Sequence, residues 1–474
     1  MCPFRANTMS EIELFPVEVL CCIFDKLNGL ERRPLHLVCR RWYRVLTSRH
    51  YLRKRILAVS PSTIGLVATR VRNAHRFPCA RISDDNSEPK SDSRRGFFDM
   101  LFNYLYFGDW RKQLRELTLD QVQGDLLYEL FDGKYEKMEF PNLKYLKISC
   151  YELCPSLGIQ TWKMPVQLTK LEITVGMPVE MLLIEILAPQ LEELLIESSK
   201  MRLLLMCCDV AVFEKLRILQ LKSDTFFPER FADSREIGDK FVKTLNRLDK
   251  LAIEFRHNDF LLGYAPLLRH CHSLSSLSIF GADLCVEACN VIGQMQGLRQ
   301  LELLMRIEKC DKLIPWNLPN LRSIHTFVES LIPLGEKLPS LKVIRVSNHT
   351  IREGRFSVTP MEQHYAERYV TYLGKLSKLT LYDVHVEEHF LLRFPMMQAT
   401  ELVLRCVRTS TLVLDVIYER IPKVASVYFL DCCFPVSPQA KISSFESLQS
   451  LLPHARISHS SSKILPVDHE QISS

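Results

Sequence analysis

The sequence predicts an α/β protein in which a small N-terminal helical unit precedes an irregular solenoid of strand and helix repeats. Two observations predict this fold. Two amphipathic helical patterns lie close to the N-terminus, and from Leu114 onward a leucine-containing phrase returns at intervals of mostly about 23 to 26 residues. The expected domains are a tail at 1–11, the helical unit at 12–58, a linker or flexible loop at 59–96, the solenoid at 97–457 and a flexible tail at 458–474.

The first helical pattern begins at Pro16, whose fixed φ and missing N–H suit the first position of a helix. Its apolar face consists of Val19, Leu20, Ile23, Phe24 and Leu27. The second pattern begins at Pro34, and its apolar residues form one continuous helical stripe: Leu35, Val38, Cys39, Trp42, Val45 and Leu46. A helix pair this short cannot bury both stripes well by itself.

The order and spacing of these residues resemble the F-box pattern. The resemblance rests on an opening at Leu14-Phe15-Pro16-Val17-Glu18, a pair at Ile23-Phe24 and a close at Val38-Cys39-Arg40-Arg41-Trp42. In that family the box binds a Skp-type adaptor, which bridges to a cullin and a RING subunit. The adaptor-binding residues that the resemblance implies are Leu14, Phe15, Pro16, Val19, Leu20, Ile23, Phe24, Leu27, Val38, Cys39 and Trp42. The alternative is that these helices only cap the first repeat.

The repeated phrase has two leucine-like residues three positions apart and a third two positions further on, as in Leu274-Ser-Ser-Leu277-Ser-Ile279. The last two positions place both side chains on one face of a strand. Segments of helix length, such as Asp239 to Leu245 and Val286 to Ile292, lie between phrases. One strand and one helix per unit, stacked many times, predict a parallel sheet on a concave face and helices on a convex face.

The phrase also resembles leucine-rich repeats, and its combination with an F-box resembles the F-box/leucine-rich-repeat family. The asparagine or cysteine that such repeats carry five residues after the second leucine occurs clearly only at Cys432. On each strand the residues beside the inward leucines face away from the core. From Phe280 onward this outer row becomes richer in aromatic residues and arginine, which are common in binding hot spots. The candidate substrate-binding residues are Phe280, Arg345, Tyr382, Arg405 and Tyr428.

Composition excludes several classes of protein. With 474 residues and 47% hydrophobic residues, the chain can bury a large core and is not a disordered protein. The sixteen cysteines belong to a long chain that begins with no signal-peptide pattern, so reduced thiols in a cytoplasmic or nuclear protein are expected. No segment is long and apolar enough to span a bilayer.

No catalytic, cofactor-binding or metal-binding motif is present. His270-Cys271-His272 and Cys207-Cys208 place potential ligands side by side, which does not suit one tetrahedral ion. Basic residues crowd the second helical pattern, among them Arg40, Arg41 and Arg44. A nucleic-acid surface, a solvated face and contact with an acidic adaptor are three interpretations of this run.

The sequence therefore predicts a non-enzymatic substrate receptor of a Skp-cullin-F-box ubiquitin ligase, with an unidentified protein as substrate. The alternative is a leucine-rich-repeat binding scaffold with no role in ubiquitin ligation. An enzyme is a more distant possibility, because it would need titratable residues from several repeats brought together by the fold.

Overall fold

The computed structural model describes most of the chain between Phe15 and Leu465. The described stretches, some with short internal gaps, are 15–46, 56–65, 77–83, 96–131, 139–150, 164–223, 237–255, 265–304, 316–327, 338–347, 375–382 and 386–465. The chain divides into two compact units, Met1–Leu191 and Glu192–Ser474. The tail expected at 1–11 and residues 466–474 lie outside the described residues, as does Leu14.

The first unit begins with a small helical domain. Its described elements are α1 (Val17–Asp25), the 3-10 helix η2 (Pro34–Leu37) and α3 (Arg40–Leu46). Their shared core consists of Leu20, Phe24, Val45 and Leu46. The ring of Trp42 meets that of Phe24 edge-on, with 5.1 Å between the centroids, so each helical pattern buries part of its apolar stripe against the other.

The prediction of one continuous helical stripe from Leu35 to Leu46 is wrong. The chain leaves helical geometry between η2 and α3, because Cys39 precedes α3 as a cap. Its sulfur accepts a hydrogen bond from the backbone N–H of Trp42 at 3.4 Å. The tighter winding of η2 then changes the phase of the apolar residues, so that Leu37 and Val38 are exposed.

The rest of the first unit is a parallel sheet with helices. The described elements are β1 (Ile56–Val59), β2 (Cys79–Ser83), α7 (Trp110–Gln113), β3 (Glu116–Val122), α8 (Gly124–Phe131), β4 (Tyr145–Cys150), β5 (Lys170–Thr174) and α9 (Val179–Leu187). Each strand from β1 to β5 pairs in parallel with the next one along the chain. The sheet thus starts at Ile56, inside the segment expected to be a helical unit and then a linker. Ala80 and Ile82 supply the inward side chains of β2.

The second unit continues the same architecture. Its described strands are β6 (Glu193–Ser198), β7 (Ile218–Ser223), β8 (Lys250–Phe255), β9 (Ser276–Phe280), β10 (Gln300–Leu304), β11 (Ser323–Phe327), β12 (Val343–Ser347), β13 (Lys378–Tyr382), β14 (Glu401–Arg405), β15 (Ser426–Leu430) and β17 (Arg456–Ser460). These strands follow one another across the sheet in that order, and the pairs are parallel. The short strands β16 (Cys433–Pro435) and β18 (Lys463–Leu465) form a second parallel pair.

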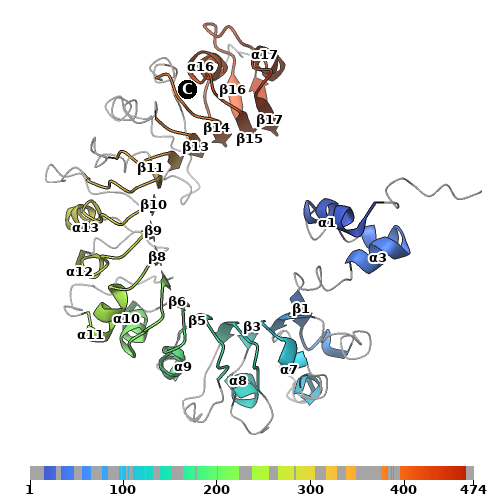
Figure 1. The fold of residues 1–474 in the computed structure, drawn as a ribbon, viewed down its shortest axis with the longest axis vertical. Coiled ribbons are helices and arrows are strands. Elements are labelled where there is room, and N and C mark those ends of the chain that lie inside the picture. Colours follow the sequence, from blue (N-terminus) through green and yellow to red (C-terminus); the bar gives the residue numbers. More distant parts are fainter. Residues whose placement is uncertain are drawn as a thin grey trace, which may run out of the picture. The chain divides into compact units, whose positions relative to one another are not determined.

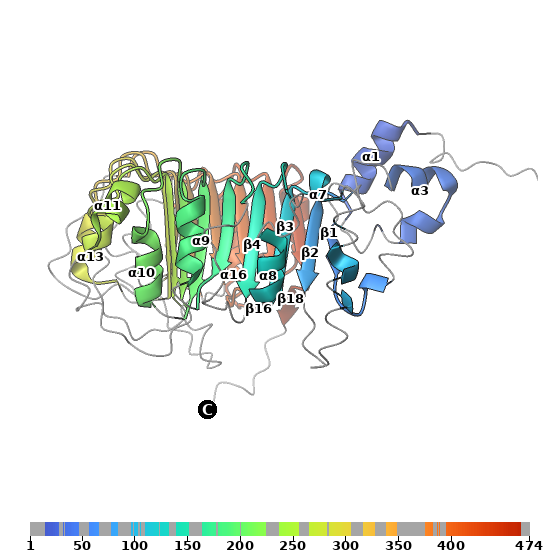
Figure 2. The same ribbon diagram turned by 90° about the horizontal axis from the view of Figure 1, so that it is seen from below.

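The described helices of the second unit lie on one side of this sheet (Figures 1 and 2). They are α10 (Met201–Asp209), α11 (Asp239–Leu245), α12 (Ala265–Leu268), α13 (Val286–Ile292), α16 (Leu412–Arg420) and α17 (Phe445–Leu451). The helical segments expected at Asp239 to Leu245 and Val286 to Ile292 are confirmed residue for residue. The flexible tail expected from 458 is wrong in its first part, because β17 and β18 extend the structure to Leu465.

The leucine phrase sets the register of the second unit. Its middle leucines pair with one another from strand to strand, as in Leu251 with Leu277 and Leu277 with Leu301. These residues and the last apolar residues of each phrase are buried on the helix side. The intervening residues point to the opposite side, which we call the open face because the described helices do not cover it. A sheet with one packed face therefore presents a regular grid of side chains.

Local contacts close the turns of the solenoid at specific residues. The carboxylate of Asp209, at the end of α10, accepts from the backbone N–H of Phe241 at the start of α11, with 3.0 Å between N and Oδ1. A Cβ on Gly293 would overlap Cδ1 of the buried Trp316, so only glycine fits there. Cys432, at the asparagine or cysteine position of the repeat, is buried, and its sulfur donates to the carbonyl of Leu404 at 3.2 Å.

Candidate functional site

The helical domain divides the apolar residues of α1 between a core and an exposed stripe. Leu20 and Phe24 are four residues apart and completely buried. Phe15, Val19 and Ile23 are also four residues apart, so they line the neighbouring side of the helix. Their exposed fractions are 38%, 40% and 40%, which are high for apolar side chains of one small domain. We call these three residues the apolar stripe.

Further apolar side chains are exposed on η2 and α3. Leu37 is 88% exposed, and Val38 and Tyr43 are each 54% exposed. Arg41 of α3 donates to the carbonyl of Phe15 at 2.6 Å, which holds α3 close to the start of the apolar stripe. A charged surface around exposed apolar anchors is typical of a protein interface.

Part of the basic run has a structural role. Arg32, which precedes η2, donates from Nε to the carbonyl of Phe24 near the end of α1, at 2.7 Å. Arg41 of α3 donates to the carbonyl of Phe15, just before the start of α1. Arg40 and Arg44 are exposed. The run is therefore not one uniform basic surface.

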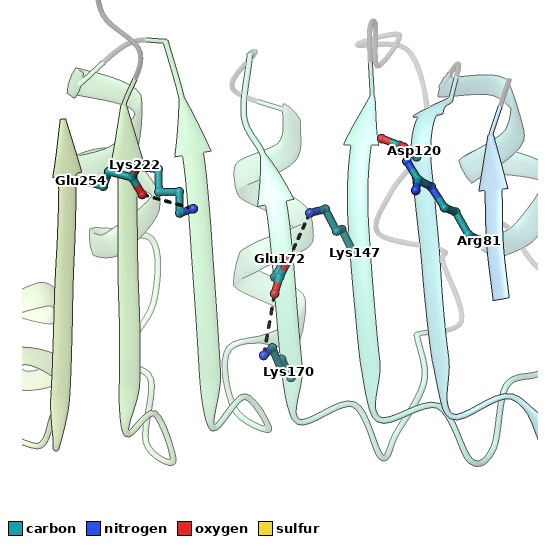
Figure 3. Close-up of polar contacts among 7 residues, drawn as sticks. All are labelled: Arg81, Asp120, Lys147, Lys170, Glu172, Lys222 and Glu254. Atoms are coloured by element: carbon teal, nitrogen blue, oxygen red, sulfur yellow. Dashed lines mark hydrogen bonds and ion pairs between the residues drawn. The ribbon is translucent and has the colours of Figure 1, made fainter. Parts of the chain in front are cut away.

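The open face of the first unit carries charges that neutralise one another within and between strands. Figure 3 shows Arg81 of β2 beside Asp120 of β3, with which it forms an ion pair, and Glu172 of β5 between two lysines. Nζ of Lys147 lies 3.4 Å and Nζ of Lys170 lies 3.8 Å from the Glu172 carboxylate. Exposed pairs of this kind contribute little stability, but they leave little net charge on this part of the face.

A polar network crosses three strands of the second unit's open face. Ser278 of β9, Glu302 of β10 and His325 of β11 are direct register partners. The Ser278 hydroxyl donates to Glu302 Oε2 at 3.2 Å, and His325 Nδ1 lies 2.5 Å from Glu302 Oε1. The hydrogen bond with His325, followed by the positive charges nearby and the bond from Ser278, holds the pKa of Glu302 below its usual value despite partial burial.

This network does not have the arrangement of a hydrolytic triad. In a triad the imidazole lies between the serine and the carboxylate, so that it can take the serine proton. Here the carboxylate of Glu302 lies in the centre and forms hydrogen bonds with both Ser278 and His325. The network orders three side chains on the face rather than activating a nucleophile.

The end of the open face from β12 to β17 combines arginine and tyrosine. The guanidinium of Arg405 on β14 lies over the ring of Tyr382 on β13, 5.3 Å from its centroid. Arg345 and Tyr428 occupy the middle register row, three strands apart. Between them Lys378 Nζ and Glu401 Oε1 form an ion pair at 2.7 Å.

Residues 12–58 match the family model described as F-box-like. The N-terminal helical domain is F-box-like. Most strands of the parallel sheet that follows the F-box-like domain carry one buried leucine phrase, which is the pattern of leucine-rich repeats.

Comparison with solved structures returns matches at low similarity. One is an internalin, inlF, from Listeria monocytogenes, with 11% identity, coverage of 87% of this chain and 88% of that chain, and a TM-score of 0.31. Another is the leucine-rich-repeat ectodomain of the receptor kinase GASSHO1/SCHENGEN3 from Arabidopsis thaliana, with 13% identity, coverage of 74% and 39%, and a TM-score of 0.29. No curated protein matches the chain.

The structure separates the expected adaptor residues by exposure. Phe15, Pro16, Val19, Ile23 and Val38 are exposed, Leu27, Cys39 and Trp42 are half-buried, and Leu20 and Phe24 are core residues of the F-box-like domain. Val17, Leu37 and Tyr43 are exposed apolar residues that the sequence pattern missed. Leu37 and Tyr43 lie outside the apolar stripe that the sequence pattern assigned to this part of the chain.

The expected substrate residues are only partly brought together. Tyr382 and Arg405 are in contact, and Arg345 and Tyr428 share their region of the open face. Phe280 lies on β9, on the far side of the Glu302 network from Arg345, and does not join them. The sequence did not predict the pair of Glu302 and His325, because its only signal is that both occupy the same position in consecutive phrases. It also did not predict a role for Arg456, which lies just before the segment expected to be a tail.

Two further observations concern the described residues as a group. Nowhere in these stretches are three or more His, Cys, Asp or Glu side chains placed to hold a metal ion. Among the helices in the same stretches, none has the length and hydrophobicity that crossing a bilayer requires. Cys271, from the His270-Cys271-His272 run, is buried and donates its S–H to the carbonyl of Leu267 at 3.5 Å.

Proposed function

We propose that this chain is the substrate-recognition subunit of a Skp-cullin-F-box ubiquitin ligase. Its F-box-like domain binds the Skp-type adaptor, and the open face of the repeats binds the protein to be ubiquitinated. The chain itself performs no chemistry, since the ubiquitin-transfer machinery belongs to the cullin and RING side of the complex. The observation that carries the proposal is the F-box-like domain, with an apolar stripe beside a fully formed core.

The division of α1 supports a docking role for the stripe. The domain does not need Phe15, Val19 and Ile23 for its core, which Leu20 and Phe24 already fill together with Val45 and Leu46. An adaptor that covered the three side chains would gain from their burial. Truncating them to alanine removes roughly 100 Å² of coverable apolar area, worth about 2.5 kcal/mol or roughly seventyfold in Kd.

The test measures binding of a purified Skp-type adaptor to the intact chain by calorimetry. The variant Phe15→Ala/Val19→Ala/Ile23→Ala should bind at least tenfold more weakly while keeping the wild-type circular dichroism spectrum. The matched control is Leu182→Ala/Ile186→Ala on α9, where the exposed fractions of 39% and 38% are the same. If the stripe variant binds the adaptor as wild type does, the proposal fails.

A second experiment separates a docking domain from a cap on the first repeat. Removing the F-box-like domain must stop before Ile56, because β1 is the outer strand of the sheet and pairs with β2. A truncation at Arg55 should abolish adaptor binding and leave the thermal midpoint of the repeats nearly unchanged. A large fall in the midpoint would favour the alternative in which these helices stabilise a scaffold protein.

A further inference from the structure

The open face of the second unit carries different charges on its earlier and later strands. From β6 to β10 it presents four acidic and two basic residues: Glu193, Glu197, Glu254, Glu302, Lys222 and Lys250. From β12 to β17 it presents one acidic and four basic residues: Glu401, Arg345, Lys378, Arg405 and Arg456. The face therefore has an acidic section and a basic section.

Ion pairs and hydrogen bonds within each section neutralise or engage some of these charged side chains. Lys378 is neutralised by Glu401 in the basic section, at 2.7 Å, and Lys222 by Glu254 in the acidic section, at 3.3 Å (Figure 3). Glu302 is occupied by Ser278 and His325. Within the described part of the chain, no ion pair joins Arg345, Arg405 or Arg456 to a carboxylate. Three guanidinium groups thus provide the net charge of the basic section.

The basic section is also ordered for binding. Stacking over Tyr382 fixes the Arg405 guanidinium while leaving its N–H groups free to donate in the plane of the group. Half-buried Tyr428 adds a rigid aromatic surface in the same row as Arg345. Arginine and tyrosine in this combination are typical of residues that dominate binding energy.

The spacing of the two arginines suggests the form of the ligand. Arg345 and Arg405 lie two strands apart and differ by two residues in register, which places their Cα atoms about 12 Å apart. In an extended peptide, residues four positions apart face the same side and are separated by about 13 Å. Two carboxylates at that spacing can each form a bidentate pair with one guanidinium.

We propose that the basic section, β12 to β17 of the open face, binds an extended acidic segment of the substrate protein, with carboxylates four residues apart on Arg345 and Arg405. This inference rests on the proposed function, because it names the chemistry of the substrate. The acidic section disfavours continuation of the acidic segment over β6 to β10, which confines the bound segment to the basic section. Three unpaired guanidinium groups interrupted by Glu401 form too short a track for a nucleic-acid backbone, which needs many phosphate contacts.

The test uses fluorescence anisotropy with the full chain and a labelled peptide of about eight residues. The probe has glutamates four positions apart in a serine and tyrosine background. Three further probes replace the glutamates with lysine, replace them with phosphoserine, or are a single-stranded oligonucleotide. The glutamate peptide should bind with a Kd that rises with salt, and the lysine peptide should not bind.

The decisive variant is Arg345→Gln/Arg405→Gln, which removes both charges without reversing them beside Glu302. This variant should bind the glutamate peptide with a Kd at least about tenfold higher than that of the wild type. The matched control, Arg247→Gln/Lys423→Gln, removes two exposed charges from the turns after α11 and α16 and should leave the Kd within about twofold. Thermal melts establish that both variants are folded.

Several outcomes overturn the inference. These are equal binding of glutamate and lysine peptides, no binding of the glutamate peptide, an unchanged Kd in the decisive variant, or tight binding of only the phosphoserine peptide or the oligonucleotide. Adaptor binding is measured on the same variants. If Arg345→Gln/Arg405→Gln binds the adaptor normally but no arginine-dependent peptide binding exists, the inference fails alone; if the wild-type chain binds the peptide but no adaptor, the proposed function fails.

Discussion

Asp415 is a buried carboxylate that holds the last repeats together. It lies on α16 with only 5% of its surface exposed. Its Oδ2 accepts from the backbone N–H of Lys441 at 2.8 Å, and its Oδ1 accepts from that of Ile442 at 2.9 Å. These bonds fix the segment that leads into α17, which packs against β17. We predict that Asp415→Ala destabilises this end of the second unit.

The magnitude follows from the two bonds. A hydrogen bond to a charged group contributes about 1.5–3 kcal/mol, and an orphaned buried donor adds a desolvation cost. Losing both bonds should therefore cost about 3–5 kcal/mol. Asp415→Asn keeps one oxygen acceptor but turns an N–H₂ group toward the second donor, so we expect an intermediate loss of stability.

The assay combines urea denaturation with hydrogen exchange of the Lys441 and Ile442 amides. A local readout is needed, since repeat arrays can open at one end. The matched control is Glu419→Ala on the same helix, where the carboxylate forms an exposed ion pair with Lys441 at 2.9 Å. It should leave both measurements unchanged. Equal exchange rates in Asp415→Ala and Glu419→Ala would refute the reasoning.

Two further predictions concern titratable groups. The pKa of Glu302 is lowered in the fold, so its stabilising contribution is present above the unfolded value of about 4.3 and is lost as the pH falls through the folded value. The midpoint difference between wild type and Glu302→Gln should therefore be larger at pH 7 than at pH 3, and an equal difference at both would contradict the assignment. Burial raises the pKa of both Cys271 and Cys289 to about 12, which leaves about one thiolate in ten thousand at pH 8. Iodoacetamide should label exposed Cys22 much faster than these two. Mass spectrometry of the native chain measures the three labelling rates, and equal rates would contradict the prediction.

The leucine phrase was sufficient to predict most strands of the sheet. In a strand, residues two positions apart lie on the same face, so two apolar residues at this spacing can both be buried there. Leu277 and Ile279 therefore predict β9 without any tertiary information. The helices α11 and α13 were equally predictable because their patterns have helical period. The F-box-like domain was recognisable from the order of its residues, from Leu14 to Trp42.

The edges of the sheet were not predictable in this way. Strand β2 has only the alternation of Ala80 and Ile82 and lacks the leading leucines, so its strand conformation depends on pairing with β1 and β3. In β17, His459 lies in register with Phe429 but is exposed, and its imidazole stacks on Phe445 with 4.7 Å between centroids. A histidine at this register position gives no hydrophobic signal, and the end of the fold was therefore placed too early.

What the sequence alone determined is the period of the repeats and the presence of the box, because both depend on residues close together in the chain. What only the tertiary structure decided is which outward side chains meet. Ser278, Glu302 and His325 are more than twenty residues apart, as are Tyr382 and Arg405, and each set is assembled by parallel register. The same is true of the stripe on α1. The helical period places Val19, Leu20, Ile23 and Phe24 on one apolar face, and only packing against α3 decides which two are buried and which two remain exposed.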